Sequence, residues 1–305
     1  MMEQVSNQSL PRAVLWTLSV PALRKAALGC AGSIFSNFFY RQFKAALLPG
    51  RIPVSWVDHA LDEKIPFTPR WVGVYLDFVA FWVRILGFLR RHYRRRGIGP
   101  AAAFIGAMGK LYTFAGEAYR RHLSTTRRPR YLERPRFLLI HAADPHLMCI
   151  PSLHVMVVIF TYTRFREILR SLGDGERFAP QIEEVRRGAL RISEAILYVK
   201  QHSVNCIAAA MYAMTRFEGE LFPPAEAEDF ASRLFLRDPL PRPEDGELVR
   251  SHITALYRRF LEAGTSVPGK RAPSWEAPLI DFLRNAPPRN NARTLVQRGI
   301  KQIPG

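Results

Sequence analysis

Apolar residues recur at intervals of three and four along most of this chain, the period of a helix with one buried face. The alternation of apolar and polar residues that predicts β-strands is nowhere convincing. Residues 137–150 begin with a helical pattern that Asp144-Pro145 should bend. The pattern predicts an all-α helical bundle, with helices over residues 21–48, 54–61, 71–92, 101–123, 154–172, 183–216 (interrupted near Gly188) and 247–263.

Proline and glycine divide this chain into three parts. A Pro-Gly pair at 49–50 ends the first helical segment, and a Pro-Pro pair at 223–224 begins a tail that holds 11 of the 23 prolines. We expect this tail to be a peripheral appendage and not the seat of the chemistry. The expected parts are an N-terminal helical segment, a central helical bundle and a proline-rich C-terminal appendage, over residues 1–50, 51–222 and 223–305.

Several helical segments approach the roughly 20 apolar residues that a membrane span requires. Residues 71–89 come close but carry Asp77 and Arg84, and residues 145–163 lack Asp, Glu, Lys and Arg but contain His146 and His154. Such segments are either imperfect spans of a membrane bundle or buried helices of a soluble all-α domain. We expect membrane association, in an inner membrane or at its surface.

The charge and the cysteines limit the partners and cofactors. A net charge of +18 favours anionic partners, namely phosphate esters, anionic lipid headgroups or nucleic acid, although solvated helix faces would account for much of it. Nucleic acid is disfavoured because the basic run 90–96 lacks interleaved stacking aromatics and no DNA-binding fingerprint accompanies it. Three cysteines without a CxxC pair argue against a disulfide framework and a zinc site.

The stretch Pro151-Ser152-Leu153-His154 carries the clearest chemistry. Main-chain N–H groups at the start of the following helix form a natural anion site, and the Ser152 hydroxyl could donate to a phosphoryl oxygen. His154 lies in the first turn, where the helix dipole lowers its pKa and suits it to proton transfer near neutral pH.

A second histidine, His202, lies on the apolar face of the predicted helix 183–216, where most histidines are satisfied core residues. Lys200 could bend towards a phosphate held above that helix. Arg127 and Arg134, in a basic connector, could converge on an oxyanion with forked donors.

Together these residues resemble the type-2 phosphatidic acid phosphatase/vanadium haloperoxidase superfamily, and most closely its membrane branch with inositolphosphotransferase-like proteins. The resemblance covers about residues 60–216. The family's first motif is Lys, six residues, Arg-Pro, and Arg127 and Arg134-Pro135 match it with arginine in place of lysine. Its second motif, Pro-Ser-Gly-His, is matched here with leucine in place of glycine. Its third is Ser-Arg, five residues, His, three residues, Asp, and His202 fits its histidine.

The resemblance implies a metal-free lipid-phosphate phosphatase or phosphotransferase. His202 would be the nucleophile that forms a phosphohistidine, and His154 the acid and then the base. Arg127, Arg134 and Ser152 would bind the phosphate, with Lys200 replacing a missing arginine.

The third motif departs from the family. Its Ser-Arg pair falls on Ala195-Ile196, and its Asp falls on Cys206, whose thiol is a poor orienter for a histidine. Asn205, one residue earlier, is a weak substitute. The alternative function is therefore a catalytically degenerate protein that binds anionic lipid or a phosphorylated ligand.

Overall fold

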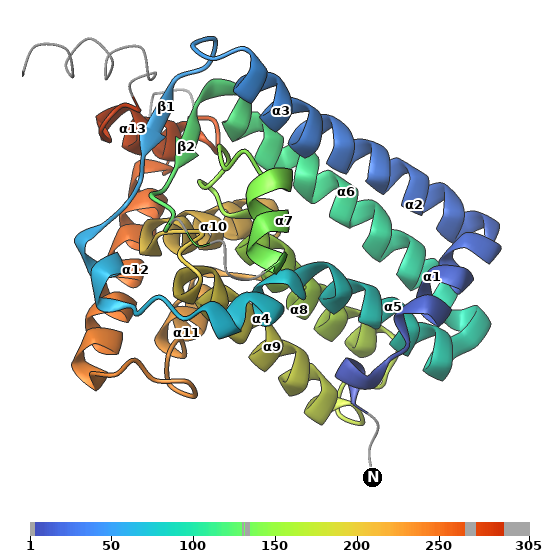
Figure 1. Ribbon diagram of the computed structural model, residues 1–305. Helices are drawn as coiled ribbons and strands as arrows, with labels where there is room; N and C mark the ends of the chain where they lie inside the picture. Colours follow the sequence, from blue (N-terminus) through green and yellow to red (C-terminus); the bar gives the residue numbers. More distant parts are fainter. Residues whose placement is uncertain (1–3, 130, 132–134, 266–272, 290–305) are drawn as a thin grey trace, which may run out of the picture.

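The computed structural model describes residues 4–129, 131, 135–265 and 273–289, most of which lie in helices, as the all-α prediction requires (Figure 1). The α-helices are α1 (Leu10–Ser19), α2 (Pro21–Ile34), α3 (Tyr40–Leu47), α4 (Val72–Leu76), α5 (Phe78–Tyr93), α6 (Ile98–Arg121), α7 (Pro135–Ala143), α8 (Leu153–Ser171), α9 (Ala179–Tyr198), α10 (Val204–Phe217), α11 (Pro224–Ser232), α12 (Pro243–Ala263) and α13 (Ala277–Asn285). Short 3₁₀ segments (Val5–Asn7, Ala60–Lys64, Pro69–Trp71, Arg94–Gly97), a π segment (Phe35–Phe39) and strands β1 (Val54–Trp56) and β2 (Leu123–Thr125) complete the described elements.

The first helices lie along α6. In Figure 1, α2 and α3 run beside α6, and the π segment joins them into one rod. Two glycines of α6 allow this approach: a Cβ at Gly109 would lie 3.1 Å from the Cα of Cys30, and one at Gly116 would lie 2.8 Å from Oδ1 of Asn37. The close packing of α2 and the π segment on α6 therefore requires glycine at both positions.

One hydrophobic core cluster extends from the N-terminal helices to the C-terminal ones. The segment from 223 onward, expected to be an appendage, contributes buried side chains to it. Phe230 of α11, Tyr257 of α12 and Leu283 of α13 are at most 1% exposed. These C-terminal helices are thus part of the bundle's packing.

The predicted short helix over 54–61 is wrong at its start. Residues Val54–Trp56 form β1, which pairs in parallel with β2, with Val54 opposite Leu123. The Trp56 N–H donates to the carbonyl of Pro287, so the C-terminal segment borders the same strand. A three-residue strand is too short to show alternation, and its partners lie far away in sequence.

The predicted long helix 183–216 is also two helices, and the break lies at 199–203 and not near Gly188. Lys200 adopts φ 54°, and α9 ends in a Schellman motif, in which the Gln201 N–H donates to the Ile196 carbonyl. Gly188 lies inside α9, which is continuous there. A Cβ at this position would lie 2.5 Å from Cε2 of Phe81, so the site requires glycine. The glycine serves a close contact between helices.

Among the described residues, one helical stretch, Pro69–Arg121, is long and apolar enough to cross a membrane. The criterion is length and composition only, and a buried core helix of a soluble protein also meets it. The two charges within its first apolar segment neutralise each other, because the Arg84 guanidinium donates to both carboxylate oxygens of Asp77 at 2.6 and 2.8 Å.

Candidate functional site

Strand β2 positions the loop that carries the Pro-Ser-Leu-His stretch. The Ser124 N–H donates to the Leu147 carbonyl, and its hydroxyl accepts the Ile150 N–H at 2.7 Å. The Tyr119 hydroxyl, on the buried face of α6, donates to the Pro151 carbonyl at 2.5 Å. Bonds on both sides of the loop therefore fix where α8 begins.

Ser152 is the N-cap of α8, and its side chain is fully buried. Among the residues that the structure describes, its hydroxyl makes no capping bond and has no hydrogen-bond partner. A buried hydroxyl without a partner costs roughly 1–3 kcal/mol, so a ligand that bonded it would recover part of that cost. The first turn of α8 leaves further N–H groups without intrahelical partners, which favours an anionic ligand.

His154 and His202 lie together, as the sequence predicted. Their ring centroids are 5.5 Å apart, with the planes at 65°. His154, in the first turn of α8, stacks on Tyr75 at 4.6 Å and contacts Phe78. His202 is not within a helix but in the turn between α9 and α10, immediately before the N-cap Ser203.

Both histidines are held in the neutral form. Burial lowers the pKa of His154 to about 4. Burial lowers the pKa of His202 well below its usual value, and repulsion from His154 and His146 adds to this effect. A neutral imidazole keeps a lone pair at pH 7, which a nucleophile requires.

A third histidine, His146, belongs to the same cluster, with its ring centroid 6.1 Å from that of His202. The hydroxyl of Thr126 lies 2.7 Å from its Nε2. Its main-chain N–H donates to Asp144 at 2.8 Å, and the Arg128 guanidinium donates to the other oxygen of this carboxylate at 2.5 Å. Burial would raise the pKa of Asp144, but the His146 hydrogen bond and the Arg128 charge hold it below its usual range.

The arginine whose charge reaches the histidines is Arg128 and not the predicted Arg127. The charge of Arg128 acts on both His154 and His202. Arg127 is exposed, and its main-chain N–H donates to Asp58. Arg134, the second predicted arginine, lies outside the described residues.

Lys200 does not join the histidines. Its ammonium group donates to the main-chain carbonyl of Asp62, in the Ala60–Lys64 segment. Burial lowers the pKa of Lys200, while the nearby carboxylates of Asp62 and Glu63 raise it. The left-handed backbone at Lys200 turns the chain out of α9 before His202, so Lys200 and His202 do not lie on one helical face.

Position 206, where the resemblance expects a carboxylate for His202, carries the thiol of Cys206. Nδ1 of His202 is buried and has no hydrogen-bond partner among the described residues. The Cys206 sulfur accepts the Ser203 N–H at 3.4 Å and serves as a helix cap. Asn205 donates to the Val57 carbonyl and accepts from Nε2 of His252, so it does not act as the substitute either.

Among the described parts of the chain, no group of three or more His, Cys, Asp or Glu side chains is placed to hold a metal ion. The chain matches no family model, no curated protein and no solved structure. The chemistry of the site is therefore argued from its own geometry.

The arrangement combines two neutral imidazoles, a guanidinium, a buried serine hydroxyl and a helix N-terminus. Groups of these kinds bind oxyanions and exchange protons in other proteins. Sequence reasoning missed Arg128, Asp144 and His146. The sequence signal for Asp144 and His146 is the Asp-Pro-His run shortly before Pro151, and Arg128 is the neighbour of the predicted Arg127 in the basic connector.

Proposed function

We propose that this protein is a phosphatase or phosphotransferase of the type-2 phosphatidic acid phosphatase kind, which acts on a phosphorylated lipid or another phosphate ester. The proximity of His154 and His202, 5.5 Å between ring centroids, carries the proposal. Two histidines at that separation can both reach one phosphorus and its leaving oxygen. The partnerless Ser152 hydroxyl and the Arg128 charge support an anionic ligand at the same place.

In the proposed reaction a ring nitrogen of His202 attacks phosphorus, and the bond from phosphorus to the alkoxide oxygen breaks. His154 gives its proton to the departing alkoxide, which leaves as an alcohol. His154 then takes a proton from water or an acceptor alcohol, whose oxygen attacks the phosphohistidine and releases His202. Arg128 and the first turn of α8 would stabilise charge on the transferring oxygens.

The low pKa of His154 fits this sequence once a phosphate is bound. Without ligand, burial keeps the imidazole neutral. A bound phosphate brings negative charge next to the ring, which raises the pKa and favours the protonated acid. We therefore expect phosphate esters to bind together with a proton.

A second function is a non-catalytic receptor for anionic lipid or a phosphorylated ligand. The observation that favours it is the Nδ1 atom of His202, which lacks a partner where the family has a carboxylate. Binding requires only the cationic and hydrogen-bonding groups, whereas catalysis also requires an oriented nucleophile. For either function we propose association with a membrane, which the apolar stretch Pro69–Arg121 supports.

Hydrolysis of a chromogenic phosphate ester and of phosphatidate by the wild-type protein, beside His202→Ala and His154→Ala, tests the proposal. We expect both variants to lose at least 99% of the rate, since each removes a reacting group. A phosphoenzyme that is labile in acid and stable in base should form in the wild type and not in His202→Ala. Equal rates in all three proteins would exclude the enzyme. Phosphate binding that persists without turnover would support the receptor.

A further inference from the structure

The exposed large apolar side chains are concentrated on one part of the molecule. Ten of the fourteen found among the described residues belong to the first 48 residues, on α1, α2, the π segment and α3 or just beyond. Leu15, Leu28 and Leu47 are 69%, 67% and 78% exposed. The ten are Val14, Leu15, Leu18, Leu28, Phe35, Phe39, Tyr40, Phe43, Leu47 and Leu48, and we call them the N-terminal apolar face.

This face carries charge of one sign only. Residues 4–57 contain no Asp or Glu, and their charged residues are Arg12, Arg24, Lys25, Arg41, Lys44 and Arg51. In α2 and α3 the cations lie towards the ends, and the stretch from residue 26 to 40 between them carries no charge. Lysine and arginine at the edges of an apolar surface can extend to lipid headgroups while the centre enters the acyl region.

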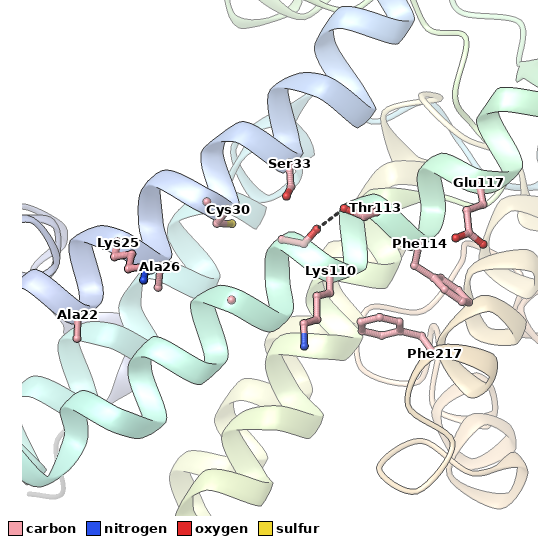
Figure 2. A pocket seen from close by; sticks show the side chains of 13 residues that line it. Ala22, Lys25, Ala26, Cys30, Ser33, Lys110, Thr113, Phe114, Glu117 and Phe217 are labelled. Carbon is pink, nitrogen blue, oxygen red and sulfur yellow. Dashed lines mark hydrogen bonds between the residues drawn. The ribbon is translucent and has the colours of Figure 1, made fainter.

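A groove borders the same helices. It lies between α2 and α6, has a volume of about 650 Å³, and is lined by small and apolar residues such as Ala26, Gly29 and Phe114 (Figure 2). Lys25 of α2 and Lys110 of α6 also line it, as does Glu117, whose carboxylate accepts a hydrogen bond from Nε1 of Trp275. An apolar groove with cations at its walls has the chemistry of a phospholipid, with an acyl chain inside and the phosphate beside the lysines.

We infer that α1, α2 and α3 form the surface through which this protein contacts an anionic lipid bilayer. The rim of a protein–protein interface carries polar groups and charges of both signs, whereas the charged residues of segment 4–57, all of them cations, match anionic headgroups. The inference specifies the membrane association proposed above. It does not depend on catalysis, because the N-terminal apolar face and the histidine cluster share no residues.

Vesicle flotation tests the inference with two variants of the full chain. The triple variant Leu15→Asp, Leu28→Asp, Leu47→Asp places negative charge on the face. The matched control Leu236→Asp, Leu248→Asp alters leucines that are 61% and 49% exposed elsewhere. We expect the triple variant to bind vesicles of phosphatidylcholine with 30% phosphatidylglycerol about tenfold more weakly than the wild type, and the control to bind normally. Wild-type binding should fall with salt and without the anionic lipid.

Unchanged binding by the triple variant, or equal loss in the control, would overturn the inference. If the wild type forms an oligomer in solution and the triple variant does not, the face is occupied by a second copy of the chain and the inference is wrong. Hydrolysis of a soluble phosphate ester by both variants separates this result from the proposed enzyme, since neither variant touches the histidine cluster.

A labelling experiment covers the case in which the triple variant fails to fold. The native thiols Cys30, Cys149 and Cys206 are buried, so a polar environment-sensitive fluorophore should label only an introduced exposed cysteine. On anionic vesicles, a label at Leu47→Cys should shift to the blue and one at Leu236→Cys should not. A label at position 47 that stays in water would overturn the inference independently.

Discussion

Replacement of Cys206 by aspartate should restore an orienting carboxylate to His202. Cys206 is fully buried in the first turn of α10, four residues after the histidine, and its sulfur accepts a hydrogen bond from the Ser203 N–H. A carboxylate there would accept the same N–H, gain from the helix dipole and be available to Nδ1 of His202, which now has no partner. We expect tighter orientation of the imidazole and a higher pKa, because a nearby carboxylate stabilises imidazolium.

The size of the effect follows from what an orienter contributes. Loss of the carboxylate partner of a catalytic histidine costs on the order of 10⁴-fold in the serine-protease triad, which sets the upper bound. Burial of a carboxylate at position 206 costs several kcal/mol before pairing, and a cap of this kind returns about 1 kcal/mol. Nearby Asp58 and Asp62 act against a further negative charge, as they do on the Cys206 thiol. We therefore expect a rate gain of about 10- to 1000-fold, with a lower midpoint of thermal unfolding.

The assay is single-turnover hydrolysis of a chromogenic phosphate ester, with the phosphoenzyme trapped in base. Cys206→Asn is the matched control, because it has the shape of aspartate without its charge. The gain should be absent in Cys206→Asn and in the double variant with His202→Ala. A folded Cys206→Asp protein with the wild-type rate would refute the reasoning, and would mean that the site differs from the family's in more than its orienter.

Three further predictions concern the site and its packing. Arg128→Gln should raise KM for phosphate esters about tenfold or more, since it removes the guanidinium that acts on both histidines, whereas Arg127→Gln should leave KM nearly unchanged. Because the folded-state pKa of His154 is about 4, against about 6.5 unfolded, the unfolded chain binds more protons between these values, and stability falls as pH falls. In urea unfolding, the loss of unfolding free energy from pH 7 to 4.5 should be about 2–3 kcal/mol smaller in His154→Gln than in the wild type, in which buried His202 adds to the loss. Gly188→Ala should lower the unfolding free energy by about 1–2 kcal/mol through its clash with α5, whereas Gly106→Ala, which meets nothing within 4 Å, should not lower it.

Periodicity in the sequence was sufficient for the longer helices. The predicted helix 101–123 is observed as Ile98–Arg121, and the predicted 154–172 as Leu153–Ser171. These segments have strong helical spacing and clear stops. The proximity of His154 and His202 followed from motif order, because a Pro-Ser cap and a later histidine suit one anion.

The errors occurred where tertiary contacts decide local structure. Strand β1 exists only because β2 and residues near Pro287 supply its hydrogen bonds. The turn before His202 contains no glycine, so its left-handed residue, Lys200, could not be identified from composition. Gly188 drew attention instead, although its role is to admit a ring from α5. For the strand and for Gly188, the determining group is distant in the sequence.

A contact from a distant segment also decides whether His202 has lost its supporting carboxylate or receives that support from elsewhere. On the α10 side, His202 has no carboxylate, as the sequence predicted. On the opposite side, the connector after β2 brings in Arg128, Asp144 and His146, and the charge of Asp144 raises the pKa of His202 against the effect of burial. A carboxylate fixed by an arginine and a histidine can stabilise an imidazolium without touching it. If Asp144 does this, Asp144→Asn should lower the rate without weakening phosphate binding, whereas a mere receptor should bind phosphate more tightly once a negative charge is removed. The loss of rate, measured beside the affinity by calorimetry, discriminates an active site with relocated support from a binding site that has lost its chemistry.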